Sequence, residues 1–499
     1  MISLLAVAGT ILVIVMVSRS MRESNLLVPQ GGVVDRQSSS RDAAADDDPE
    51  NRGTSTKSGE GNIAGSNSNQ QSSPNQRQSI DDKYPVGIFY VDPVQYMQSH
   101  TQYVRDRAGN PKLNTVLLPP ELPPATGVSD PKSAGFLGAD SCRECHADYF
   151  DSYKETSHYH TSAVASTKTI RGSFSENKKT VASKSPNIRF EMESIDGVPM
   201  QRLLIESKGE EFGADFQFDL VTGSGKLGQT YVYWKDERLY QLHVSYLTSQ
   251  DSWVNSPGYV DGTANFARPV MAPCLECHAT YFETVGGTTN HFRTNNFILG
   301  VSCERCHGAG AAHVNYHREN PNETQAHAII NPSDLSRDRA IDMCQLCHGG
   351  MPTGLKKPAF TYQAGNDLRE HYEFPANTPS GPANIHSNAQ LPRLRQSKCF
   401  QNSEKMTCSD CHNTHQFERG NLNLFSERCI QCHKPTDCGK HAAIGESIRQ
   451  NCIDCHMPPN VAEDIKIASE GALFKPTMRD HHIRISEEAT ARFLRELNP

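Results

Sequence analysis

The sequence is poor in apolar residues for a chain of its length. Only 36% of its 499 residues are hydrophobic, tryptophan occurs twice, and the mean hydropathy is -0.58. A chain this long would normally bury several apolar cores of its own. The composition therefore predicts that a group other than the side chains fills part of the interior.

The sequence also lacks an excess of positive charge. Its 49 Lys and Arg residues stand against 57 Asp and Glu residues, which gives a net charge of -8. Proteins that bind nucleic acid need a basic face to meet the phosphates, so the composition argues against a nucleic-acid partner. An acidic surface instead suits protein partners that carry basic docking patches.

The N-terminal part shows no sign of a folded core. Residues 2–17 form an apolar run of about 24 Å as a helix, slightly less than the roughly 30 Å of a bilayer core. Because no Ala-x-Ala cleavage site follows, we expect residues 1–22 to act as a membrane anchor rather than a cleaved export signal. Residues 23–83 contain no aromatic residue, which predicts a disordered linker. The proline-rich residues 84–135 are expected to form an extended arm.

Two further segments have recognisable periodicity. Between about 168 and 262, apolar and polar residues alternate, as in Ile188 to Glu193, with a turn signal at Asp196-Gly197. This pattern predicts a small β-rich insert. The C-terminal residues 486–499 have the pattern of an amphipathic helix.

Cysteine and histidine are abundant, with 16 and 21 residues. Fourteen cysteines fall in seven Cys-x-x-Cys-His motifs. A random sequence of this composition would contain about 0.02 such motifs. The spacing lets two thiols bond the vinyl groups on one porphyrin edge while the histidine binds the iron. Structural zinc does not require a histidine after every second cysteine, and neither redox pairs nor disulfide frameworks repeat this spacing seven times. The sequence therefore predicts seven covalently attached haem c groups.

The motif residues divide into thioether-forming cysteines and iron-binding histidines. The cysteines are Cys142, Cys145, Cys274, Cys277, Cys303, Cys306, Cys344, Cys347, Cys408, Cys411, Cys429, Cys432, Cys452 and Cys455. The histidines are His146, His278, His307, His348, His412, His433 and His456. Six motifs follow one another at about 30 residues each, too little chain for separate apolar cores. We therefore expect residues 136–485 to form a mainly α and irregular multihaem cytochrome fold organised around stacked haems.

Fourteen histidines remain for the second axial positions, twice the number that seven haems need. His415 follows His412 by about one helical turn, so it lies on the proximal side of that haem and cannot cap the same iron. His313 stands in a similar relation to His307, after a turn containing two glycines. Each is expected to serve a neighbouring haem or none.

Several short segments resemble extracytoplasmic multihaem cytochromes of a type abundant in planctomycetes. This class is related to cytochrome c-554, the tetrahaem electron carrier of hydroxylamine oxidation, and to octahaem hydroxylamine oxidoreductase. The resemblance covers roughly residues 136–485. The segments that show the resemblance are Tyr153-x-x-Thr156-x-His158, Gln229 to Tyr231, Ser256 to Gly258, Cys303 to Val314, Gln390 to Arg393, Ser397 to Phe400, Cys408 to His415, Cys455 to Pro458 and Arg479 to His481.

The resemblance implies a set of second axial ligands. They are His158, His313, His386, His415 and His481. Two positions remain, for which His160, His371 and His441 are the candidates.

Two functions follow from this pattern. We favour an electron carrier that exchanges electrons with redox proteins such as a membrane quinol-oxidising complex or periplasmic cytochromes. It is expected in the periplasm or on the outer face of the cytoplasmic membrane. The alternative is an oxidoreductase that acts on hydroxylamine, nitrite or a sulfur oxyanion, which requires a haem with an open face. The sequence contains no Cys-x-x-Cys-Lys variant and has a surplus of histidines, which favours the carrier.

Two cysteines lie outside the motifs. They are Cys399 and Cys438. Because the expected compartment is oxidising and an even number of cysteines lies outside the motifs, we hypothesise that these two form a disulfide.

Overall fold

The computed structural model describes residues 86–497, except residues 104, 107, 111, 125–134 and 375–387. The chain divides into two units, and all described residues belong to the one that contains residues 78–499. The other unit, residues 23–77, lies outside the described residues, as does the expected membrane anchor at residues 1–22.

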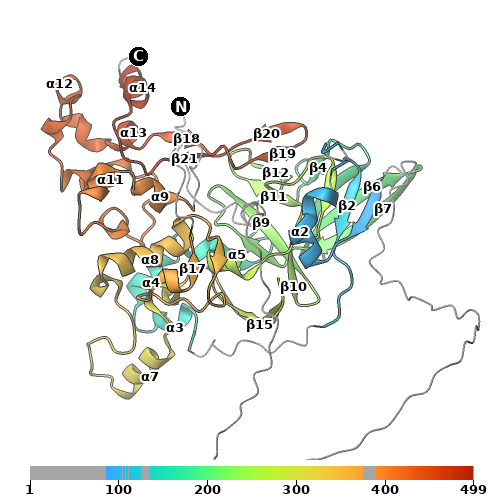
Figure 1. The fold of residues 1–499 in the computed structure, drawn as a ribbon, viewed down its shortest axis with the longest axis horizontal. Helices are drawn as coiled ribbons and strands as arrows, with labels where there is room; N and C mark the ends of the chain where they lie inside the picture. Colours follow the sequence, from blue (N-terminus) through green and yellow to red (C-terminus); the bar gives the residue numbers. More distant parts are fainter. Residues whose placement is uncertain are drawn as a thin grey trace, which may run out of the picture. The chain divides into compact units, whose positions relative to one another are not determined.

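The alternating residues predicted to form strands fold into a four-stranded antiparallel sheet (Figure 1). Along β5, every second residue from Ile188 to Met192 is buried, as a sheet with one apolar face requires. Asp196 and Gly197 both have positive φ angles, which suits the tight hairpin between β5 and β6. The strands, in their order across the sheet, are β4 (Thr180–Ala182), β5 (Ile188–Ile195), β6 (Val198–Ser207) and β7 (Glu210–Gln217).

A second, six-stranded sheet packs against the first through an aromatic core. Phe190 of the first sheet and Tyr231 of the second belong to one hydrophobic cluster, together with Phe218, Trp253 and Phe266. The first six residues of β9 are buried, so both faces of this strand are covered. The strands are β3 (Ser162–Val164), β8 (Leu220–Thr222), β9 (Gly228–Lys235), β10 (Arg238–Gln241), β11 (Val244–Leu247) and β12 (Ser252–Asn255).

The proline-rich arm contributes regular structure to this body. Strands β1 (Gly87–Tyr90) and β2 (Thr115–Leu118) form a parallel sheet with β13 (Thr263–Asn265), and helix α2 (Pro93–Tyr103) lies between them in sequence. Val116 and Leu117 of β2 are fully buried. The arm is therefore integrated into the β-rich body at β2 rather than merely laid upon it.

The remaining chain alternates short helices with small hairpins. The hairpins are β14 (Ala279–Thr284) with β15 (Phe292–Leu299), β16 (Gly354–Leu355) with β17 (Tyr372–Glu373), β18 (Pro459–Val461) with β21 (Thr477–Arg479), and β19 (Ile467–Ser469) with β20 (Ala472–Phe474). The α-helices are α3 (Asp140–Arg143), α4 (Ala147–Tyr153), α5 (Ala272–Glu276), α6 (Cys303–His307), α7 (Ala311–Glu319), α8 (Arg337–His348), α9 (Gln390–Leu394), α10 (Lys398–Gln401), α11 (Leu422–Ile430), α12 (His441–Ile444), α13 (Ile453–His456) and α14 (Glu487–Leu497). The 3₁₀ turns are η1 (Tyr159–Thr161), η2 (Pro332–Asp334), η3 (Leu368–Glu370), η5 (Cys408–Asp410), η6 (Pro435–Asp437) and η7 (Gly445–Gln450).

The prediction of a mainly helical and irregular fold is wrong. Helix accounts for 28% of the structure and strand for 27%. The sheets extend beyond the expected insert at residues 168–262, from Ser162 to Leu299, and recruit β1 and β2. The motif density after Cys274 pointed to helices, but the β-rich body has a hydrophobic core of its own. No helix within the described ranges is long and apolar enough to cross a membrane.

We expect Gly172→Ala to lower the melting temperature of the protein. A Cβ atom at Gly172 would lie 2.2 Å from Cζ2 of Trp253, whose indole belongs to the aromatic core. Overpacking of this kind costs about 1–3 kcal/mol. Gly213→Ala in β7 is the control, because its Cβ would meet Leu204 at an ordinary 3.5 Å. Equal melting temperatures for the two variants would contradict the packing described here.

Candidate haem-binding sites

The motif residues lie on single turns of helix. In four motifs the backbone N–H of the histidine donates to the carbonyl of the first cysteine. This bond measures 2.9 to 3.1 Å in the motifs that end at His146, His412, His433 and His456. Residues at positions i, i+3 and i+4 share one helix face. Both thiols and the imidazole of such a motif can therefore meet the same porphyrin.

Four of the seven motif histidines face a second histidine at a nearly constant distance. The second residue of each pair is one that the resemblance implies as a distal ligand. The ring centroids are 6.4 Å apart for His146 and His313, 6.1 Å for His307 and His415, 6.1 Å for His348 and His158, and 6.2 Å for His412 and His481. The structure thus brings together residues that are far apart in the sequence.

The spacing of these four pairs fits one metal atom between two imidazoles. A bond from an imidazole nitrogen to a transition metal is about 2 Å, so two bonds and two ring radii separate the centroids by roughly 6 Å. Histidine ring contacts outside the pairs vary more widely, from 4.1 Å between Tyr316 and His327 to 6.5 Å between His371 and Tyr372. The four pairs therefore have the geometry that bis-histidine haem iron requires.

Hydrogen bonds at Nδ1 orient several of these imidazoles. The acceptor is a backbone carbonyl at 2.8 Å from His307, 2.8 Å from His313, 3.1 Å from His456 and 3.3 Å from His278. A carbonyl can only accept, so Nδ1 carries the proton and Nε2 keeps its lone pair. Metal-binding histidines are typically oriented by this kind of bond.

Burial favours the neutral form of three of the facing imidazoles. Desolvation, followed by the neighbouring His348, lowers the pKa of His158 to about 4. Desolvation and the nearby His412 likewise lower the pKa of His481 to about 4. Burial is also the largest cause of the lowered pKa of His415. Because neutral imidazole is the form that binds metal, these rings are ready for ligation at neutral pH.

Three motif histidines have no facing histidine ring among the described residues. They are His278, His433 and His456. Of the remaining candidates, His371 has its Nδ1 3.2 Å from the hydroxyl of Thr361, and His441 lies 3.4 Å from a carboxylate oxygen of Glu446. His160 is exposed beside Tyr159. His386 lies outside the described residues.

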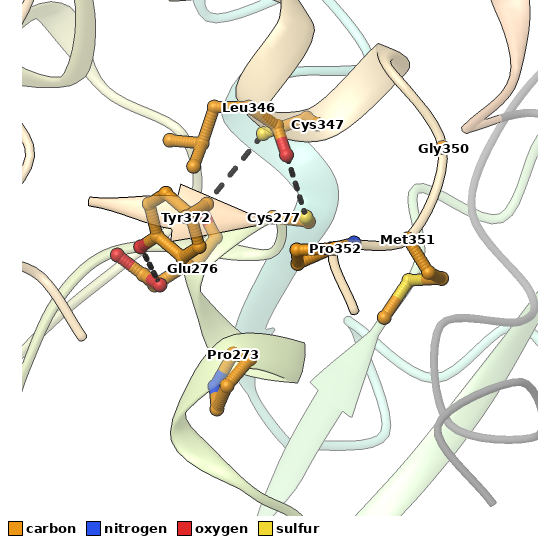
Figure 2. Close-up of a pocket in the computed structure, with 9 residues that line it drawn as sticks. All are labelled: Pro273, Glu276, Cys277, Leu346, Cys347, Gly350, Met351, Pro352 and Tyr372. Atoms are coloured by element: carbon orange, nitrogen blue, oxygen red, sulfur yellow. Dashed lines mark hydrogen bonds between the residues drawn. The ribbon is translucent and has the colours of Figure 1, made fainter. Parts of the chain in front are cut away.

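The second and fourth motifs touch each other. Cys277 Sγ lies 3.8 Å from the carbonyl oxygen of Leu346, and Cys347 Sγ lies 3.9 Å from that of Glu276 (Figure 2). These residues, with Tyr372, line one small pocket. The attachment points of the two motifs are therefore neighbours, although about 70 residues separate them in the sequence.

Contacts between thiols join further motifs. A hydrogen bond with Cys303 raises the pKa of Cys142, and a hydrogen bond with Cys408 raises the pKa of Cys344. The first motif is thus adjacent to the third, and the fourth to the fifth. Groups attached at these cysteines would follow one another closely.

A buried carboxylate in the second motif links it to the third. Glu276 is 1% exposed, accepts a 2.6 Å hydrogen bond from the N–H of Phe360, and is also bonded to the hydroxyl of Tyr372. Arg305, inside the third motif, lies 3.4 Å from it. Neither residue was predicted from the sequence. The sequence feature that could have identified them is a charged residue between the two cysteines of each motif.

Glu304, a second buried carboxylate, links the third motif to the segment before the first. Its carboxylate accepts 2.8 Å hydrogen bonds from the N–H groups of Leu137 and Gly138, and a 2.9 Å bond from that of Gly310. Glu304 is 3% exposed. The backbone leading into the first motif is therefore fixed against the third.

The two cysteines outside the motifs are free thiols in the structure. Cys399 interacts electrostatically with Cys411 and Cys429, whereas Cys438 interacts with Cys452 and Cys455. The hypothesis of a bond between Cys399 and Cys438 thus finds no support in the geometry.

Comparisons with known proteins agree with the motif chemistry. A family model described as "Cytochrome c554 and c-prime" matches residues 141–191 and 231–308. The search of curated proteins gave no match. The matched segments contain the first three motifs. Together, the seven motifs and this match identify the chain as a multihaem c-type cytochrome.

Two solved structures are similar to this chain. One is described as the crystal structure of the outer cell wall cytochrome OcwA, with 16% identity and a TM-score of 0.44 over 72% of this chain and 81% of that one. The other is an undecahaem cytochrome from the S-layer of Carboxydothermus ferrireducens, with 16% identity and a TM-score of 0.33. The likeness spans 71% of this chain and 53% of the undecahaem protein.

We expect Glu276→Gln to destabilise the haem-loaded protein by about 3–5 kcal/mol, because Arg305 loses its buried counter-charge. Glu144→Gln is a matched control, since Glu144 occupies the same position of the first motif. Its ion pair with Arg318 is exposed, so the loss should stay within about 1 kcal/mol. Denaturant unfolding measures both variants. Similar losses would show that burial of Glu276 does not matter.

Proposed function

We propose that the chain binds seven haem c groups and conducts single electrons along them. The observation that carries this proposal is the set of four facing histidine pairs, at 6.1 to 6.4 Å between ring centroids. Haem with two histidine ligands supplies a one-electron iron couple and has no open position for a substrate. Such groups suit electron transfer rather than substrate chemistry.

The pairs connect the motifs to one another. His313 follows the third motif and serves the first, whereas His158 follows the first and serves the fourth. His415 follows the fifth and serves the third, and His481 follows the seventh and serves the fifth. Each iron is therefore held between segments that belong to different motifs. This exchange of ligands keeps successive haems close, which is the condition for rapid electron hopping.

The location and partners follow from the covalent attachment and the surface charge. We place the protein outside the cytoplasm, in the periplasm or on the outer face of the membrane, with residues 1–22 as its anchor. Its net charge of -8 suits redox partners that carry basic docking patches. Membrane quinol-oxidising complexes and other cytochromes are the expected classes of partner.

A second candidate function rests on the second motif. His278 is buried, and no second histidine ring faces it among the described residues. A haem with one open face there would permit reduction or oxidation of hydroxylamine, nitrite or a sulfur oxyanion. The carrier function requires instead that the second motif obtain another ligand, for which His160, His371, His386 and His441 remain the candidates.

Carbon monoxide binding separates the two functions. A carrier with seven six-coordinate haems should bind none when fully reduced. Binding of one equivalent by the wild-type protein, together with turnover of hydroxylamine or nitrite, would establish the enzyme. Replacing both Cys274 and Cys277 by Ser, which removes the haem of the second motif, should then abolish that binding.

His415→Ala tests the ligation scheme directly. We expect the variant to keep all seven haems, because attachment depends on the motif cysteines. One haem should become high-spin and bind carbon monoxide, because His307 loses its facing partner.

Intact mass measures the haem count of this variant, and resonance Raman spectroscopy measures the spin state. His327→Ala is the control, since its exposed side chain faces no motif histidine among the described residues. An unchanged low-spin spectrum for His415→Ala would remove His415 from the ligands. Fewer than seven haems in the wild type would contradict the proposed number.

A further inference from the structure

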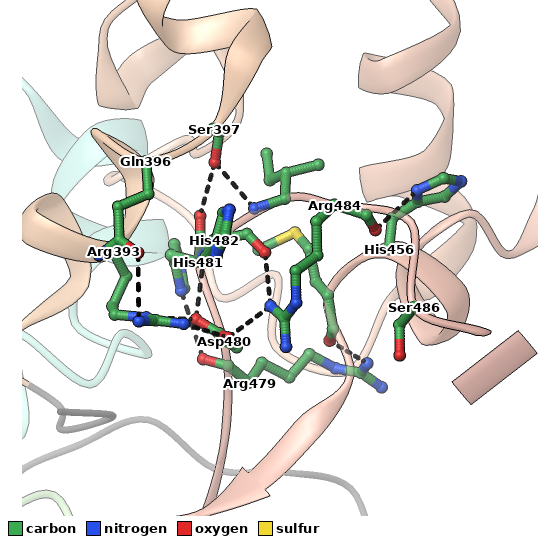
Figure 3. Close-up of polar contacts among 12 residues, drawn as sticks. Arg393, Gln396, Ser397, His456, Arg479, Asp480, His481, His482, Arg484 and Ser486 are labelled. Carbon is green, nitrogen blue, oxygen red and sulfur yellow. Dashed lines mark hydrogen bonds and ion pairs between the residues drawn. The ribbon is translucent and has the colours of Figure 1, made fainter. Parts of the chain in front are cut away.

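The carboxylate of Asp480 is fully buried between two arginines (Figure 3). Arg393 binds it through two nitrogens, at 2.7 and 2.6 Å, and Arg484 approaches the second oxygen at 2.6 Å. The N–H of His482 completes the set at 3.0 Å. A carboxylate with this many charged partners is held in one orientation.

A second anchor grips the backbone directly after Asp480. Ser397 is fully buried, and its hydroxyl donates to the carbonyl oxygen of His481 at 3.1 Å. The same hydroxyl accepts from the N–H of Ile483 at 2.8 Å. Both Arg393 and Ser397 come from α9 and the turn that follows it. One corner of the chain therefore fixes residues 480–483 at two points.

This segment needs such anchors because it is irregular. Residues 480–486 belong to no helix or strand, so no backbone ladder sets the direction of the His481 side chain. Yet the His481 ring lies 6.2 Å from that of His412, with 20° between the ring planes. His313, by contrast, is carried on helix α7. The precision at His481 must come from side chains that hold its neighbours.

The same segment also reaches the seventh motif. The carbonyl oxygen of Arg484 accepts a 3.1 Å hydrogen bond from Nδ1 of His456. Arg479 donates to Asp454, inside that motif, at 2.5 Å. Residues 479–484 therefore contact the fifth site through the His481 side chain, and the seventh through the Arg484 carbonyl and the Arg479 side chain.

We propose that Arg393, Asp480 and Ser397 form a clamp that positions His481 on the iron of the fifth site and, through Arg484, orients His456 at the seventh. The inference rests on the proposed ligation by His481. These are positioning residues: none of them is an iron ligand. The clamp makes the geometry of two sites depend on one buried ion pair, since a shift of residues 480–484 moves both.

Three variants of the full haem-loaded protein test the clamp. His481→Ala should expose one carbon monoxide-binding haem per chain. Asp480→Asn removes the charge that Arg393 grips, and Ser397→Ala removes only the bridging hydroxyl. Both should retain all seven haems by mass while part of the fifth-site haem becomes high-spin and reactive toward carbon monoxide. If Asp480→Asn does not yield folded protein, Ser397→Ala alone tests the clamp.

The control is Asp215→Asn, which breaks an exposed Arg–Asp pair with Arg202 in the β-rich body. It should leave the spin states unchanged. If His481→Ala opens no haem, the ligation of His481 is wrong. If His481→Ala opens one but neither Asp480→Asn nor Ser397→Ala does, the clamp alone is overturned. An equal effect of Asp215→Asn would also overturn it, because general destabilisation would then explain the spectra.

Discussion

The facing of two imidazoles about 6 Å apart is the constraint on which the helical part of this cytochrome depends. A motif histidine occupies one side of a porphyrin, and a residue one turn further on lies on that same side. The opposite ligand must therefore come from another part of the chain. Each of the four pairs meets this requirement by joining a motif histidine to a segment that follows a different motif, so the contacts that pair the histidines also build the tertiary structure.

The variable positions of the motifs carry part of the scaffold. Glu276 and Arg305 meet from the second and third motifs, and Glu304 fixes the backbone that enters the first. All three are at most 8% exposed. Buried charges are tolerated only when they are paired or well hydrogen-bonded. Their value here is that a charged pair has a defined geometry, whereas an apolar contact allows sliding between neighbouring attachment points.

The sequence predicted the attachment residues because covalent chemistry fixes their spacing, whatever the fold. It also singled out His313 and His415, because a histidine so close behind a motif cannot cap its own haem. The partners His146 and His307 could not be assigned, since that choice depends on how distant segments pack. The balance of helix and strand was misjudged because strands outside the expected insert, such as β2 and β14, are short and buried on consecutive residues, so they show no alternation.

The residues around Asp480 show a different limit of prediction. Arg393 and Asp480 lie 87 residues apart, and nothing in the local sequence of either indicates that they are paired. Such a contact becomes visible only once the chain has folded. It is also the kind of contact that an irregular segment requires, because the segment has no hydrogen-bond ladder to hold it.

The segment that begins at His158 ties the β-rich body to three motifs at once. His158 faces His348 of the fourth motif, and its carbonyl accepts from Val301, just before the third. Thr161 accepts from Nδ1 of His278 in the second and donates its hydroxyl to the carbonyl of the same residue at 2.9 Å. The chain then continues directly into β3.

This convergence requires a glycine at position 300. Gly300 has a φ of +69°, and a Cβ atom there would lie 2.3 Å from the carbonyl oxygen of Tyr159. The two backbones can therefore approach only where one residue lacks a side chain. Because the approach lies next to β3, the sheets provide a rigid base against which the second, third and fourth motifs are aligned. The β-rich body, whose core also includes Cys274 of the second motif, thereby helps to align the motifs around it.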